Sequence, residues 1–232
     1  MIKIHDRDLR GKSKRGWLDS AHTFSFGGFH DPDRMGFKSL RVVNDDRIIG
    51  GAGFPFHSHE NMEIITYVLD GALEHKDSTG TGAVIRPNDI QRMSAGRGIE
   101  HSEFNHSKDN IVHLLQIWIL PAEQDIEPSY EQKSFEESDY RNGFKLVGDR
   151  HGTDGGITIH QDVQMYVAKP DEGESVSYNL KEGRGAFLHV AKGAVELNDE
   201  PLKEGDAAEI IDENQFAVKA SVDSELILFD LI

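Results

Sequence analysis

His57-Ser58-His59 and, further along the chain, His101-Ser102-Glu103 are the stretches that say most about the fold and chemistry of this protein. In each, two side chains of the metal-ligand type stand at positions i and i+2. In a β-strand such residues point to the same face, because side chains alternate with a period of two. Two strands paired through these stretches would bring three imidazoles and one carboxylate together. That donor set suits a transition metal better than calcium or magnesium, which prefer oxygen ligands. The predicted metal ligands are His57, His59, His101 and Glu103.

Short runs that are typical of strands surround these two motifs. They lie at residues 39–43, 63–69, 72–76, 82–85, 90–94 and 111–120. Turn residues separate them, and the Asp70-Gly71 pair between two such runs is a hairpin signal. Helical periodicity is weak nearly everywhere. Many short strands, few helices and frequent glycine turns predict an all-β protein built from barrels or sandwiches.

A second, fainter copy of this pattern follows later in the chain. Residues 187–197 (FLHVAKGAVEL) resemble residues 65–75 (ITYVLDGALEH) in the placement of apolar residues and of the central glycine. We therefore predict an N-terminal metal-binding barrel over 1–128 and a C-terminal barrel over 141–232. The polar stretch 129–140 between them is expected to be a linker, either a short helix or irregular. The second copy carries no His-x-His or His-x-Glu and is expected to lack metal ligands.

Composition narrows the classes of function. The formal net charge is −16, and residues 129–232 contribute −12 of it, so the protein repels phosphate backbones and nucleic-acid binding is not expected. There is no cysteine, which excludes disulfides and thiolate metal sites. The charged N-terminus lacks the apolar core of a signal peptide, and no stretch approaches the ~20 apolar residues of a membrane span. We expect a cytoplasmic monomer without a membrane partner.

Two further residues near the motifs have two interpretations each. Glu63 shares the strand parity of His57 and His59, so it is either an inward-pointing base or a half-exposed acid at a barrel rim. His113 lies in the apolar run 111–120 and is either a hydrogen-bonded core residue or a support behind the metal. Five phenylalanines are either pocket walls or ordinary core: Phe24, Phe26, Phe29, Phe54 and Phe56.

The remaining candidates carry weaker signals. His5 and His75 are expected at the surface. The pair formed by His160 and Asp162 is a weak alternative metal site in the second half. The basic residues within 10–15 are expected to form a solvated turn before the first strand.

Several motifs together resemble one known family. Gly51-x5-His57-x-His59 resembles the first motif of the cupin superfamily. The second motif departs from most cupins, since Pro87-Asn88-Asp89 stands where Pro-x-Gly is usual, but residues 93–103 (MSAGRGIEHSE) resemble the signature of pirins. The resemblance covers about residues 15–120 and extends more weakly through the second half. It implies a bicupin, with two jelly-roll β-barrels in one chain and few short helices.

The resemblance also implies a function. Bacterial pirins of this length include quercetin 2,3-dioxygenases, so the implied activity is a metal-dependent opening of a flavonol ring by dioxygen with release of carbon monoxide. His57, His59, His101 and Glu103 match the family's metal ligands, and Glu103 is the candidate catalytic base. Fe(II) is the expected cofactor, with Zn, Mn, Co, Ni or Cu as alternatives, because geometry and supply decide which metal such a site holds. The competing interpretation is a regulatory module or redox sensor that binds metal and a protein partner without turnover.

Overall fold

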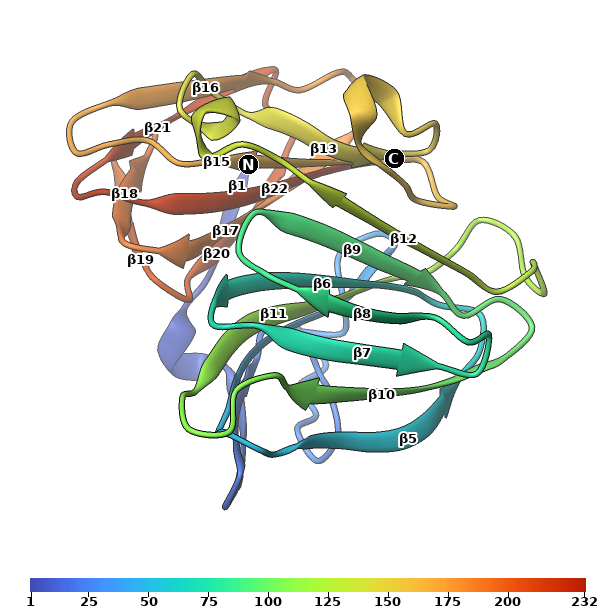
Figure 1. Cartoon of the computed structure of the whole chain (residues 1–232). Coiled ribbons are helices and arrows are strands. Elements are labelled where there is room, and N and C mark those ends of the chain that lie inside the picture. Colours follow the sequence, from blue (N-terminus) through green and yellow to red (C-terminus); the bar gives the residue numbers. More distant parts are fainter. The chain divides into compact units, whose positions relative to one another are not determined.

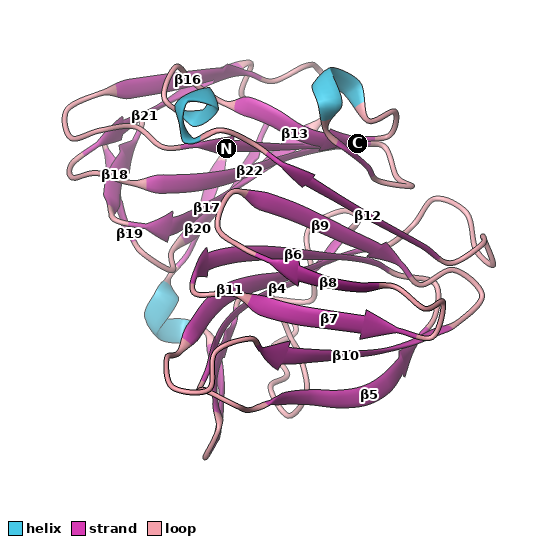
Figure 2. Ribbon diagram, viewed as in Figure 1, coloured by secondary structure: helices cyan, strands magenta, loops and turns pink.

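Strands make up most of this protein, as Figure 2 shows for the computed structural model, which describes residues 1–232. The helical elements are three short 3-10 turns, η1 (Arg7–Leu9), η2 (Glu137–Tyr140) and η3 (Thr153–Gly155). The chain divides into two compact units. We call residues 11–134 with 157–161 the N-terminal barrel, and residues 1–10, 135–156 and 162–232 the C-terminal barrel. The predicted all-β, two-barrel fold is confirmed.

The N-terminal barrel consists of two antiparallel sheets (Figure 1). Its strands are β2 (Gly11–Arg15), β3 (Leu18–His22), β4 (Leu40–Ile48), β5 (Gly53–His59), β6 (Glu63–Asp70), β7 (Leu73–Asp77), β8 (Gly82–Ile85), β9 (Asp89–Ser94), β10 (Ile99–Asn105), β11 (Val112–Ile119), β12 (Ser129–Ser134) and the short β14 (Ile157–Thr158). The larger sheet has the order β12-β9-β6-β11-β4-β3-β2, and the smaller one has the order β5-β10-β7-β8. Part of the core is an apolar cluster that includes Leu18, Ile48 and Leu114.

The C-terminal barrel repeats this two-sheet plan. Its strands are β1 (Ile2–His5), β13 (Lys145–Asp149), β15 (Val163–Ala168), β16 (Ser175–Asn179), β17 (Gly185–Lys192), β18 (Ala194–Leu197), β19 (Glu200–Lys203), β20 (Ala207–Ile211), β21 (Gln215–Ala220) and β22 (Glu225–Leu231). One sheet contains β1-β20-β17-β22-β15-β13 in this order, and the other has the order β16-β21-β18-β19. Between them lies one large apolar cluster, in which Leu188, Phe216 and Leu228 are fully or almost fully buried.

The limits of the two units differ from the expected 1–128, 129–140 and 141–232. The first ten residues belong to the C-terminal barrel, because β1 pairs with β20. The first half of the expected linker is strand β12, which hydrogen-bonds along β9, and the second half contains η2. The basic stretch expected as a turn is strand β2, paired with β3. Strands β1, β12 and β2 each pair with a strand whose backbone groups would otherwise be left unpaired at the edge of a sheet.

The sequence similarity between residues 65–75 and 187–197 corresponds to equivalent hairpins in the two barrels. Gly71 joins β6 to β7 with φ +81°, and Gly193 joins β17 to β18 with φ +85°. A positive φ favours glycine, which has no Cβ to clash. The matched glycines of the sequence therefore mark the same turn in each barrel. No helix of the protein is long and apolar enough to cross a membrane.

Candidate metal centre

A cavity of about 260 Å³ lies inside the N-terminal barrel. Strands β5 and β10 of the smaller sheet contribute the two sequence motifs to its wall. Strands β2, β3, β4 and β11 of the larger sheet contribute polar side chains and Trp118. The loop after β3 closes the lining with Phe26, Gly27 and Gly28. Both motifs of the sequence thus contribute side chains to one cavity.

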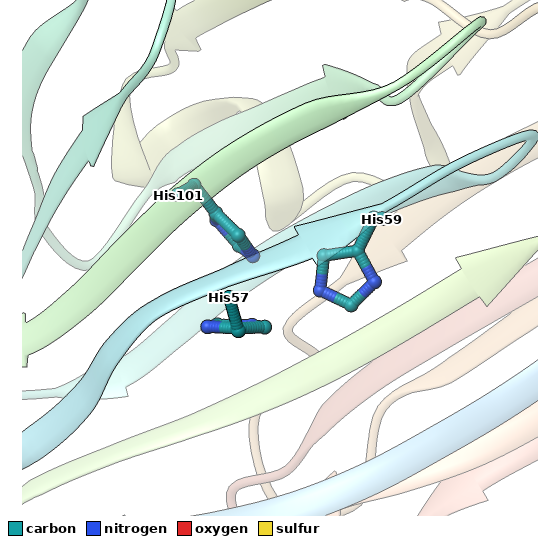
Figure 3. A group of neighbouring side chains, drawn as sticks. All are labelled: His57, His59 and His101. Atoms are coloured by element: carbon teal, nitrogen blue, oxygen red, sulfur yellow. The ribbon is translucent and has the colours of Figure 1, made fainter.

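Three of the four predicted ligands come together in this cavity. Strands β5 and β10 are antiparallel neighbours, and His101 stands directly opposite His57 in their register. The ligand atoms of His57, His59 and His101 all lie within 4.8 Å of one another. Figure 3 shows the two rings from β5 and the one from β10 turned toward a common point. This group is the place where the protein could hold a metal ion.

The hydrogen bonding of His57 and His101 and the low pKa values of His59 and His101 fit a metal ion. His101 is 1% exposed, and neither of its ring nitrogens has a hydrogen-bond partner in the protein. His57 Nδ1 lies 2.8 Å from the carbonyl oxygen of Pro55, and a proton shared there leaves Nε2 available. Burial, followed by repulsion from His57, lowers the pKa of His59 to about 4 and that of His101 to about 2. Both imidazoles are therefore neutral at pH 7, as coordination requires.

The fourth predicted ligand, Glu103, lines the same cavity but is not a member of the close histidine group. Its Oε1 accepts hydrogen bonds from Gln116 Nε2 at 2.5 Å and from Thr66 Oγ1 at 3.4 Å. Burial raises the pKa of Glu103 to about 7, opposed by the Gln116 bond and reinforced by the charge of Asp46. A carboxyl group with a pKa near neutrality can both accept and donate a proton at physiological pH.

Aromatic side chains form the apolar walls of the cavity. The rings of Phe26 and Trp118 meet edge to face at 5.4 Å, and Trp118 meets His59 at 5.0 Å. Phe54 lines the cavity together with His57, although three positions separate them, because a bulge in β5 opposite β10 changes the strand parity.

Of the five phenylalanines considered from the sequence, only Phe26 and Phe54 line the cavity. Phe24 is buried core, the Phe29 ring lies against Gly11, and Phe56 is 58% exposed.

The polar wall of the cavity on the larger sheet was not predicted from the sequence. In register across neighbouring strands, His22, Asn44, Gln116 and Thr66 stand side by side. His22 Nδ1 lies 2.8 Å from Asn44 Oδ1. Two residues along each strand, Ser20 Oγ donates a short hydrogen bond to Asp46, and burial raises the pKa of Asp46 to about 7. The available signal was a polar residue inside an apolar run, such as Gln116 between Leu115 and Ile117 in β11.

Glu63 takes neither of its two expected roles. It is fully buried, and it faces away from the cavity because its neighbour Ile64 lines it. Its Oε2 accepts hydrogen bonds from the backbone N–H of His160 at 3.1 Å and pairs with the ring Nδ1 at 3.0 Å. The three-residue connection between β5 and β6 breaks the parity on which the prediction depended. His160 accordingly helps to anchor residues 157–161 and is not part of a metal group.

The expected surface positions of His5 and His75 are wrong. Both are 1% exposed, and each shares a hydrogen bond with a carboxylate, His5 with Glu209 at 2.6 Å and His75 with Asp77 at 3.0 Å. A buried partner offsets the desolvation of the imidazole. His113 lies 2.8 Å from Asp45 and takes the role of a hydrogen-bonded, mostly buried residue.

Known proteins resemble this chain along its whole length. The family model described as Pirin matches residues 4–119, and the one described as Quercetinase C-terminal cupin domain matches residues 146–231. The quercetin 2,3-dioxygenase of Escherichia coli (strain K12) is 43% identical over 231 residues, covering 100% of this chain and 99% of that protein. The pirin-like protein of Caulobacter vibrioides is 38% identical over 231 residues, covering 99% of each. The crystal structure of the Escherichia coli pirin YhhW in complex with nickel(II) has a TM-score of 0.94 and 42% identity, covering 100% of this chain and 99% of that one.

Proposed function

This chain belongs to the pirin family, and on that premise we propose that it is a metal-dependent quercetin 2,3-dioxygenase. The observation that carries the proposal is the group of three converging histidines inside an aromatic-walled cavity; burial keeps His59 and His101 neutral, and both ring nitrogens of His101 are unpartnered. A flavonol is a flat aromatic molecule with a hydroxyl beside a ketone, and this pair of oxygens suits chelation. The cavity therefore offers a site for a metal ion and flat aromatic walls to one substrate class.

In this proposal His57, His59, His101 and Glu103 hold one divalent transition metal. Fe(II) is our first choice, with Zn, Mn, Co, Ni or Cu as alternatives, because nitrogen-rich sites of this type accept several first-row ions. A relative crystallised with nickel(II) supports a divalent ion in this fold. The bound cation would supply Lewis acidity, which lowers the pKa of the flavonol hydroxyl, together with a centre for dioxygen chemistry.

The chain's own residues then handle the proton and the substrate. Glu103, with its pKa near 7, accepts the proton of the flavonol hydroxyl, while Gln116 and Thr66 hold its carboxylate in place. Phe26, Phe54 and Trp118 position the rings and keep bulk water out.

The overall reaction is balanced without an external reductant. One oxygen atom of dioxygen bonds to each of the two ring carbons that flank the hydroxyl-bearing carbon. The two bonds that hold the hydroxyl-bearing carbon in the ring break, and this carbon leaves as carbon monoxide. The substrate supplies all the electrons that dioxygen takes up, so the products are an aromatic ester and carbon monoxide.

The test is dioxygen uptake by the purified protein with quercetin. The protein is loaded with Fe(II) and, in parallel, with each of the other divalent ions, and His101→Ala is the control. We expect uptake in step with flavonol loss and carbon monoxide release, absent from the control. Absence of uptake with full metal occupancy would contradict the proposal and favour a metal-dependent module that binds a protein partner without turnover.

A further inference from the structure

The part of the cavity wall formed by the larger sheet is polar, although it is the buried face of a β-sheet. Asp46 is 3% exposed and lines the cavity from β4. The hydroxyl of Ser20, its partner in the register of β3 and β4, donates a hydrogen bond to one carboxylate oxygen of Asp46. No positively charged side chain pairs with this carboxylate. A buried acid without a cation is costly unless another donor reaches it.

A second polar atom in the same wall lacks a partner altogether. Gln116 is 7% exposed, and its Nε2 donates to Glu103 and to Thr66. Its Oε1 is buried and has no hydrogen-bond partner in the protein. Such a group in a cavity wall is an acceptor that a ligand with a suitable donor can satisfy.

We propose that Asp46, oriented by Ser20, and Oε1 of Gln116 form a hydroxyl-binding subsite that selects flavonols carrying phenolic hydroxyls beyond the chelating pair. This inference rests on the proposed function and names the substrate subclass within it. Both groups accept hydrogen bonds, and phenolic O–H groups are strong donors. Ser20 fixes the carboxylate of Asp46 before substrate arrives, which lowers the entropic cost of recognition.

The subsite explains why selection would be by hydroxylation rather than by size. A site built to bond a substrate hydroxyl discriminates strongly against the analogue that lacks it, because its own buried polar groups are then left unpaired. The aromatic walls, by contrast, accept any flat ring of the right dimensions. Phe26 and Trp118 therefore contribute affinity without discriminating between flavonols that differ in their hydroxyl groups.

The experiment compares two flavonols in the metal-loaded enzyme. Quercetin carries hydroxyls on both outer rings, and 3-hydroxyflavone carries only the chelating hydroxyl and ketone. The variant is Asp46→Asn, which replaces an acceptor oxygen by a donor of the same shape. The matched control is Asp45→Asn, the same change on the neighbouring residue, which points away and bonds His113 and Arg47. For each protein we measure kcat/KM with both flavonols, and metal content.

We expect Asp46→Asn to lower kcat/KM for quercetin by about tenfold or more relative to its effect on 3-hydroxyflavone, since the buried acceptor oxygen is lost and the phenolic hydroxyl is left without its partner. The control should change both substrates equally. An equal effect of Asp46→Asn on both flavonols would overturn the subsite and leave the proposed function intact. Should Asp46→Asn not fold, Ser20→Ala weakens the same subsite and should shift the ratio in the same direction.

Failure of the proposed function would look different. If the wild type turned over neither flavonol, anaerobic binding of both compounds would still test the subsite. Tighter binding of quercetin than of 3-hydroxyflavone, with the difference reduced in Asp46→Asn, would support it. Equal affinity of the wild type for the two flavonols would overturn it.

Discussion

The two barrels share one topology and differ in what lines the interior of the larger sheet. Equivalent positions across four central strands, aligned through the two matched hairpins, are polar in the N-terminal barrel and hydrophobic in the C-terminal barrel. The polar row is Asn44, Gln116, Thr66 and Gln91, and the hydrophobic row is Tyr166, Leu228, Leu188 and Ala208. The fold therefore does not make the site. In the N-terminal barrel Asn44 and Gln116 of this row line the cavity, whereas Leu188 and Leu228 belong to the packed core of the C-terminal barrel.

The two rows contribute differently to the stability of their barrels. Leu188 and Leu228 belong to a continuous apolar cluster, and burying each such side chain contributes about 1.5–3 kcal/mol. The matching Thr66 and Gln116 are also buried, but they hold Glu103 instead of packing against apolar neighbours. The N-terminal barrel gives up part of its core stabilisation to keep a carboxylate oriented. Residues that break the packing pattern are typical of functional sites.

The largest expected effect is the loss of the metal in His101→Ala. The variant removes one of three converging imidazoles, and we expect metal affinity to fall about 100-fold or more, with oxygen uptake at baseline. Metal content after dialysis is the measurement. His106→Ala, a loop histidine outside the cavity with a half-exposed side chain, is the control and should retain the metal. Full metal content in the His101 variant would remove this residue from the ligand set.

A polar residue placed in the hydrophobic row should destabilise the C-terminal barrel. Leu228→Gln buries an amide among apolar side chains with no partner, and we expect it to lower the free energy of unfolding by about 3 kcal/mol. Urea unfolding checks this. Leu228→Met, which conserves volume, should cost less than about 1.5 kcal/mol. An equally mild effect of glutamine would mean that the two rows tolerate the same residues.

The reverse change should separate catalysis from metal binding. Gln116→Leu gives the N-terminal barrel the residue of its counterpart and removes the donor that holds Glu103. We expect turnover of quercetin by the fully metal-loaded protein to fall about 10–100-fold, because a hydrogen bond to a charged group is worth about 1.5–3 kcal/mol, while the three histidines still hold the ion at saturating metal concentration. Gln164→Leu in the C-terminal barrel is the matched control. Unchanged turnover in Gln116→Leu would show that the polar row is dispensable.

The smallest effect is a pH dependence of stability. Burial raises the pKa of Asp46 from 3.8 to about 7, so the folded protein favours its neutral form. Its ionisation therefore destabilises the fold increasingly as the pH rises from about 4 to about 7, whereas Asn does not titrate. We expect Asp46→Asn to gain on the order of 1–3 kcal/mol relative to wild type between pH 5 and pH 8. Thermal unfolding at the two pH values measures it, and a constant difference would contradict it.

The sequence predicts the histidines well and their surroundings poorly, for physical reasons. The i, i+2 spacing places His57 and His59 on one face through local geometry alone. The pairing of His57 with His101 joins strands far apart in the chain, and only the converging ligand types suggested it. Strand alternation predicted the wrong facing for a side chain wherever the strand was interrupted. This happened at the β5 bulge near Phe54 and at the turn before Glu63.

The polar row escaped prediction because its members belong to different strands. Thr66 and Gln116 are each a single polar residue in an apolar run, which a strand tolerates at many positions. Only the register shows that they stand side by side with Asn44 and share a carboxylate on the other sheet. The limits of the two barrels could not be predicted from local sequence either, because β1 and β12 pair with strands that are distant in the chain.

The most direct test of the account is an anaerobic titration of the protein with quercetin. The absorption of a flavonol shifts to longer wavelength when its hydroxyl loses the proton, so the spectrum reports deprotonation in the cavity before any oxygen reacts. We predict a red shift that saturates at one flavonol per chain with Fe(II) present, and that is absent without metal and in His101→Ala. A shift of the same size in the metal-free protein, or none in the loaded one, would contradict the claim that the three-histidine cavity of the N-terminal barrel is the catalytic site.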